Sequence, residues 1–146
     1  MSKHAVEIAN LLYRYAELMD CGDLPKVAAL FRDALVKVGN QGEPLGEAGM
    51  LELWRQHVKI HPCGTPRTKH VITNPIIEIN DTDDSATCRS YYTVLQATES
   101  LPLQVIAAGR YHDRFEYVNG QWRFCYRDYS MLDLVGDLSD HLKVLT

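Results

Sequence analysis

The sequence predicts an α+β fold, in which a curved, mainly antiparallel mixed sheet packs on N-terminal helices and encloses a cavity. Apolar residues recur at helical spacing in the first third of the 146-residue chain, and they alternate with polar residues after the loop marked by Pro62, Gly64 and Pro66. Helices that are followed by a run of strands indicate an α+β arrangement. Neither a linker nor an internal repeat divides the chain, so we expect one domain over residues 1–146.

The helices are expected before residue 58. The first carries an apolar stripe that includes Tyr15 and Met19, and Gly22 ends it. Asp23 can cap a second helix that runs toward Phe31. A short strand over Ala34–Val38 and a third helix over about Gly46–His57, with Trp54 inward, complete this part of the chain.

Four long strands are expected after the loop. They span Thr68–Ile79, with a bulge at Pro75, then Thr87–Ala97, Leu103–Val118 and Gln121–Met131. Asn119-Gly120 is a hairpin signal between the last two. Strands of this length curve, and the first and third helices can cover the concave face while leaving a cavity. The tail over residues 132–146 could form a short helix.

Composition excludes several classes of function. The net charge is −4 and the basic residues are scattered, so we expect no binding to nucleic acid. No apolar stretch is long enough for a signal peptide or a membrane span, so we expect a cytoplasmic protein that does not bind membranes. The four cysteines form no C-x-x-C pair and are expected to be reduced and mostly buried.

Asp20 and His70 are the candidate catalytic residues. Asp20 follows Met19, which closes the apolar stripe of the first helix. It either reaches water or caps the next turn near Gly22, or it is buried and needs a partner. His70 shares a strand face with Ile72 and Asn74; a lone strand histidine is more often structural or exposed. If His70 points inward, a bond to Asp20 would fix its tautomer and make the other ring nitrogen a general base.

Further polar and aromatic side chains are candidates for the cavity wall. The tyrosines could instead be packed strand residues with hydroxyls in water, and Arg127 could pair with Asp128 or Asp133 at the surface. The candidate substrate-binding residues are Tyr15, Trp54, Asn74, Ser90, Tyr92 and Arg127, with Tyr111 and Tyr129 beside them.

We expect no metal and no cofactor. His57, His61 and Cys63 have a spacing that could place ligands together, but Pro62 breaks the geometry and a fourth ligand is not evident. The chain also lacks a glycine-rich phosphate loop and the nucleophile motifs of covalent catalysis.

Several of these segments together resemble a known family. Residues 8–16 (IANLLYRYA), 19–23 (MDCGD) and 29–31 (ALF) are similar to the first two helices of the SnoaL-like branch of the nuclear-transport-factor-2-like (NTF2-like) superfamily. Residues 70–74 (HVITN) resemble its His-x3-Asn strand. Residues 109–115 (GRYHDRF), 119–124 (NGQWRF) and Arg127 resemble its last hairpin. The resemblance covers about residues 4–133 and implies an NTF2-like cone.

Within that superfamily the chain resembles the scytalone dehydratases and hexachlorocyclohexane dehydrochlorinases. Their Asp–His dyad corresponds to Asp20 and His70, and the basic residue on the last strand of the dehydrochlorinases corresponds to Arg127. The resemblance implies a cofactor-independent lyase or isomerase that acts on a small apolar, aromatic or alicyclic molecule, and a homo-oligomer, a dimer or trimer built through the sheet. The alternatives are a non-catalytic binding or assembly module, like the small subunit of ring-hydroxylating dioxygenases, and an epoxide-opening hydrolase.

Overall fold

The structure is a computed structural model that describes residues 2–143. Its helices and strands are α1 (Lys3–Asp20), α2 (Leu24–Ala29), β1 (Leu35–Lys37), α3 (Glu47–His57), β2 (Thr68–Asn80), β3 (Ser85–Gln96), β4 (Gln104–Val118) and β5 (Gln121–Val135). The expected order of three helices, one short early strand and four long strands is confirmed.

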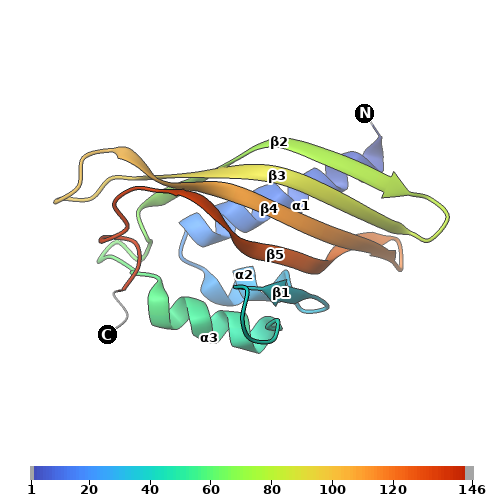
Figure 1. Cartoon of the computed structure of the whole chain (residues 1–146), viewed down its shortest axis with the longest axis horizontal. Coiled ribbons are helices and arrows are strands. Elements are labelled where there is room, and N and C mark those ends of the chain that lie inside the picture. Colours follow the sequence, from blue (N-terminus) through green and yellow to red (C-terminus); the bar gives the residue numbers. More distant parts are fainter. Residues whose placement is uncertain (1, 144–146) are drawn as a thin grey trace.

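The strands form one sheet in the order β1-β5-β4-β3-β2. The long strands pair antiparallel, and β1 pairs parallel with β5, so the sheet is mixed. Figure 1 shows α1 lying along one face of the curved sheet, with α2 and α3 beyond β5 and β1. This arrangement confirms the predicted α+β cone and makes β2 an edge strand next to α1.

Local signals in the sequence fix the end of α1. The Asp23 side chain accepts a hydrogen bond from the backbone N–H of Lys26 and caps α2. Between the two helices, Gly22 has a φ of +81°, a value that side-chain-bearing residues rarely adopt. A Cβ at Gly22 would lie 2.4 Å from the carbonyl oxygen of Gly64, so the helix end packs directly on the 61–65 loop. Asp20 is therefore held as the last residue of α1.

The apolar stripe of α1 packs against the concave face of the sheet. Ile8, Leu12, Tyr15 and Met19 are buried there with Phe31, Trp54 and the inward residues of β3, β4 and β5. A second, smaller apolar cluster contains Val94, Leu101, Ile106 and Ala107, and Tyr92 packs against both clusters. The core is thus divided at the end of the sheet where β2 begins.

Two expectations need correction. The tail is not a helix in the part described: β5 continues to Val135 and a turn follows, while residues 144–146 lie outside the described residues. The thiols are not mostly buried, because Cys21 and Cys63 are exposed and only Cys88 is buried; all four cysteines are free.

The bulge in β2 is confirmed as a register shift between Thr73 and Ile76. No helix within residues 2–143 is long and apolar enough to cross a bilayer.

Candidate active site

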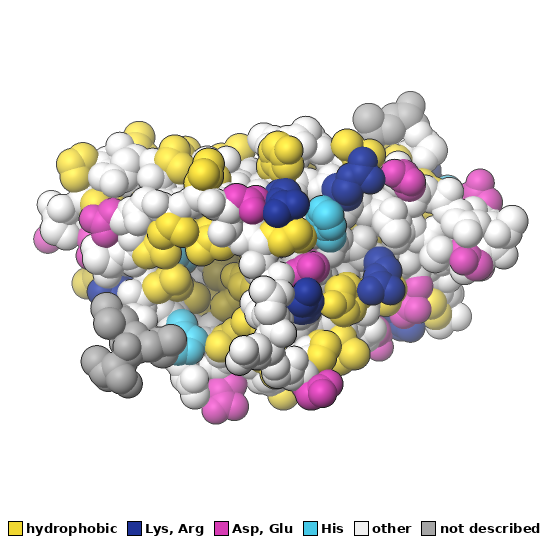
Figure 2. Space-filling view, viewed as in Figure 1, with side chains coloured by type: hydrophobic (Ala, Val, Ile, Leu, Met, Phe, Trp, Pro, Cys, Tyr) yellow, Lys and Arg dark blue, Asp and Glu magenta, His cyan; other side chains and the backbone are white. Residues whose placement is uncertain are grey.

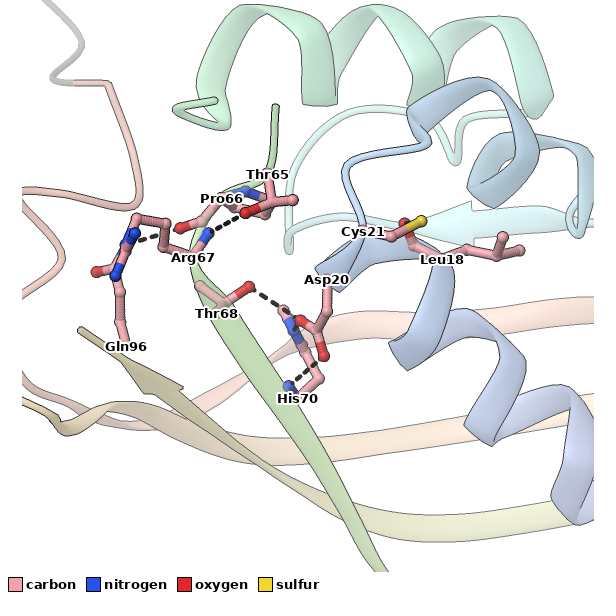
Figure 3. Close-up of polar contacts among 9 residues, drawn as sticks. All are labelled: Leu18, Asp20, Cys21, Thr65, Pro66, Arg67, Thr68, His70 and Gln96. Atoms are coloured by element: carbon pink, nitrogen blue, oxygen red, sulfur yellow. Dashed lines mark hydrogen bonds and ion pairs between the residues drawn. The ribbon is translucent and has the colours of Figure 1, made fainter. Parts of the chain in front are cut away.

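The structure brings Asp20 and His70 together. The Nδ1 atom of His70 lies 2.6 Å from Oδ1 of Asp20, and the backbone N–H of His70 donates to Oδ2 over 2.7 Å (Figure 3). The hydroxyl of Thr68 donates to Oδ1 over 2.9 Å. Both dyad side chains are largely shielded, with 6% of His70 and 10% of Asp20 exposed.

The position of Asp20 follows from the edge of the sheet. Because β2 has a neighbour only on its β3 side, the backbone N–H of His70 points toward the end of α1 and needs an acceptor there. The carboxylate of Asp20 supplies it. An ionised carboxylate only accepts, so we place the ring proton of His70 on Nδ1. Within residues 2–143 the remaining ring nitrogen, Nε2, has no hydrogen-bond partner and is free to accept a proton.

A surface pocket opens on the outer side of the dyad. It has a volume of about 520 Å³, and its lining includes Tyr13, Glu17, Asp20, Lys69 and His70. The volume is in the range of small-molecule sites. Glu17 and Lys69 place charged side chains on its wall.

The inner side of the dyad is aromatic. The ring of Tyr15 lies edge-on to His70 at a centroid distance of 6.3 Å and contacts Trp54 and Tyr111. Tyr111 in turn stacks between Tyr92 and Tyr129. Burial raises the pKa of Tyr15, Tyr92 and Tyr111, so these hydroxyls keep their protons and are available as donors.

Arg127 is buried within this aromatic group. Its Nε and Nη2 atoms donate to both oxygens of Asp113 over 2.7 and 3.0 Å. The guanidinium lies 3.8 Å from the ring centre of Tyr111 and 4.5 Å from that of Tyr15. Burial raises the pKa of Asp113 and by itself would lower the pKa of Arg127. The charge and hydrogen bonds of Asp113 oppose this effect, so the pKa of Arg127 is raised and the guanidinium stays charged.

Several buried polar atoms, most of them on or beside these rings, have no hydrogen-bond partner within residues 2–143. They are Tyr15 Oη, Trp54 Nε1, Ser90 Oγ, Gln96 Oε1, Arg127 Nη1 and His141 Nδ1. Leaving such an atom unpaired costs about 1–3 kcal/mol, so a group of them indicates a place for bound molecules or water. Figure 2 shows the surface hollowed between the end of β5 and α3, with apolar side chains inside the hollow.

Comparison with known proteins identifies the family of this chain. The model of the SnoaL-like domain matches residues 2–128. The chain belongs to the SnoaL-like family.

Similar solved structures support the same cone. Three of them come from Novosphingobium aromaticivorans. An NTF2-like protein with a cystatin-like fold has a TM-score of 0.71 and 21% sequence identity, and the match covers 88% of this chain and 82% of that one. For a candidate scytalone dehydratase the TM-score is 0.69 and the identity 22%, with 92% and 87% of the two chains covered; for the beta subunit of a candidate aromatic-ring-hydroxylating dioxygenase they are 0.67 and 21%, with 95% of each chain covered. At these identities the likeness shows the fold alone. Two further similar structures, from Mycobacterium tuberculosis and Nostoc punctiforme, are of proteins of unknown function. No curated protein matches the chain.

The SnoaL-like cone places most of the expected side chains on its inner side. Tyr15, Trp54, Ser90 and Arg127 are buried there, and Tyr92 is partly buried against Tyr111. Arg127 pairs with Asp113 rather than with Asp128 or Asp133, because cross-strand register sets Asp113 opposite it. Asn74 does not join the group: it is exposed, with a φ of +42° at the bulge of β2.

Sequence reasoning missed Thr68, Asp113 and His141. Thr68 could have been found from its position two residues before His70, since alternate strand residues share a face. Asp113 lies in the resembling hairpin, but its partner depends on register. No signal in the tail marks His141. Within residues 2–143 no group of three or more His, Cys, Asp or Glu side chains is arranged to hold a metal ion.

Proposed function

We propose that this SnoaL-like protein is a cofactor-independent lyase or isomerase, in which the His70–Asp20 dyad removes a proton from a small apolar cyclic substrate. The observation that carries the proposal is the dyad geometry. The Asp20 carboxylate binds Nδ1 of His70 at 2.6 Å and leaves Nε2 without a partner within residues 2–143. A carboxylate-oriented imidazole of this kind is suited to act as a general base.

The chemistry follows from the proton positions. Nε2 of His70 takes a proton from a substrate carbon, and the C–H electron pair becomes part of a double bond. In a dehydration the hydroxyl leaves with the proton that His70 then returns, and water is formed; in a dehydrochlorination, chloride leaves. In an isomerisation, His70 returns the proton to another carbon. The negative charge of Asp20 stabilises the imidazolium in each case.

We place the substrate on the inner side of the dyad. Aromatic rings would pack against its apolar surface, and Tyr15, Trp54, Ser90, Tyr92 and the free Nη1 of Arg127 would bind its polar groups. The partnerless polar atoms support the inner side, whereas the outer pocket carries Glu17 and Lys69. The variants Trp54→Phe and Lys69→Gln separate these locations: loss of turnover in Lys69→Gln alone would favour the outer pocket.

The test is turnover of a panel of hydroxylated and halogenated ring compounds, together with hydrogen–deuterium exchange at the α-carbons of 2-tetralone in heavy water. We expect His70→Gln and Asp20→Asn to lower the catalysed rate by roughly 10²–10⁴-fold. His112→Gln is the matched control, because this histidine is exposed on β4. If both dyad variants turn over as fast as the unaltered protein, the proposal is wrong.

A second candidate is a binding or assembly module, because the outer face of the sheet is apolar. Val71, Tyr91, Leu132 and Leu134 are 40%, 55%, 41% and 69% exposed on it, and Figure 2 shows hydrophobic side chains gathered over this face near the end of β5. We propose that the face binds a second copy of this chain in a homo-oligomer. Light scattering after size exclusion should give a dimer or trimer that Tyr91→Arg/Leu134→Lys converts to monomer. If the protein has an assembly role alone, neither the unaltered protein nor any variant should turn over the ring compounds.

A further inference from the structure

The segment over residues 136–143 carries a histidine to the dyad. The ring centroids of His141 and His70 lie 6.2 Å apart, and His141 is 9% exposed. Figure 1 shows the chain turning back from the end of β5 toward α3. This segment lies outside residues 2–128, which the SnoaL-like model matches, so membership of the family assigns it no role.

Hydrogen bonds on both sides of His141 fix its position. The backbone N–H of Lys59 donates to the carbonyl of His141 over 2.8 Å, and that of Lys143 donates to the carbonyl of His57 over 2.8 Å. The carbonyl of Asp140 accepts from the Gln96 side chain over 3.0 Å. Because these contacts come from the ends of α3 and β3, the fold itself delivers the His141 ring to the site.

One nitrogen of His141 lacks a partner. Its Nδ1 atom is buried and makes no hydrogen bond within residues 2–143. Burial, helped by the neighbouring His70, lowers the pKa of His141 to about 4, against a smaller opposing effect of Asp20; His61 is the other titratable group that acts on it. The imidazole is therefore neutral at pH 7 and carries one N–H, and a neutral imidazole can polarise a carbonyl without giving up its proton.

Building on the function proposed above, we propose that His141 contacts the substrate and donates a hydrogen bond to a carbonyl oxygen beside the carbon that His70 deprotonates. The substrate class is then a cyclic ketone. The proton moves from carbon to Nε2 of His70, the electron pair of the broken C–H bond delocalises onto the oxygen, and His141 keeps its proton. A preformed donor at the oxygen stabilises the charge that develops there.

The experiment compares two probes of similar shape, 2-tetralone and its carbonyl-free counterpart tetralin, by calorimetric titration. We expect His141→Phe to weaken binding of the ketone about tenfold and to leave the hydrocarbon unchanged. His141→Gln keeps a neutral N–H donor and should recover most of the ketone affinity. Ser139→Ala, an exposed change in the same segment, is the control. With ¹⁵N-histidine, the ketone should also shift the ring nitrogens of His141.

The proposal is overturned if the unaltered protein does not bind the ketone, if His141→Phe binds it equally well, or if the His141 nitrogens do not shift. The last result would assign Nδ1 to a water molecule. Should His141→Phe fail to fold, His141→Gln and the nitrogen shifts decide. The two proposals fail separately: deuterium exchange that survives in His70→Gln removes the dyad function, whereas ketone binding that ignores residue 141 removes only this inference.

Discussion

The backbone N–H and the ring Nδ1 of His70 bind opposite oxygens of the same Asp20 carboxylate, over 2.7 and 2.6 Å. This two-point contact fixes both the strand and the imidazole relative to the end of α1. If the carboxylate bound only the ring, the edge of β2 could move relative to α1 and the imidazole would move with it. Here the strand edge and the ring are positioned together, so changes near Asp20 should affect the proposed proton transfer through geometry.

Thr68→Val tests this positioning. The variant keeps the shape of the side chain but removes the hydrogen bond that Thr68 donates to Oδ1 of Asp20. Because a hydrogen bond to a charged group contributes about 1.5 kcal/mol or more, we expect the rate of deuterium exchange into 2-tetralone to fall about tenfold. KM should stay unchanged, since Thr68 does not contact the substrate. Thr73→Val, an exposed change on the same strand, should leave both values unaltered; equal effects of the two variants would contradict the prediction.

The buried Asp113–Arg127 pair should matter for stability when one partner is removed. Asp113→Leu leaves an uncompensated guanidinium among aromatic rings, which costs about 3–5 kcal/mol. The double variant Asp113→Leu/Arg127→Met should recover much of this loss. Urea unfolding provides the measurement. Arg110→Met is the control, because it breaks an exposed pair with Asp133 on the same two strands and should cost less than about 1 kcal/mol.

Stability should depend on pH through His141. Its folded pKa is lowered from 6.5 to about 4, so between these values the unfolded chain binds more protons and acid favours unfolding. On going from pH 7 to pH 5 this histidine should remove about 2 kcal/mol of stability, and the loss should continue down to about pH 4. His141→Gln should lose correspondingly less than the unaltered protein over the same range, as measured by urea unfolding at each pH. Identical slopes for the two proteins would show that His141 is not buried as a neutral ring.

Gly22→Ala should disturb the site from outside it. The added Cβ would lie 2.4 Å from the carbonyl oxygen of Gly64, at a φ of +81°, so the end of α1 must move away from the loop. We expect a loss of stability of about 1–3 kcal/mol, together with a lower kcat because Asp20 shifts. Thermal unfolding and exchange rates provide the readout. Gly39→Ala, with no atom within 4 Å of the new Cβ, should change neither.

Hydrophobic periodicity predicted the elements of the fold well, because each one is specified by neighbours along the chain. It predicted less well where register decides. By strand alternation Asn74 should lie on the same face of β2 as His70. The bulge between Thr73 and Ile76 breaks this alternation, and Asn74 is exposed to solvent. Arg127 was predicted to bind substrate or to pair with Asp128 or Asp133 at the surface; the surface pairing is wrong, because Nε and Nη2 donate to Asp113 across the strands.

The sequence by itself determined the succession of helices and strands and the curvature that long alternating strands impose, and it named Asp20 and His70 as the candidates for proton transfer. Those properties depend on local spacing and on residue chemistry. Only the tertiary structure decided that Asp20 accepts hydrogen bonds from the edge of β2, that Asp113 neutralises Arg127, and that His141 approaches His70. These contacts join residues from 14 to 71 positions apart, so they arise from strand register and chain reversal rather than from any neighbouring pattern.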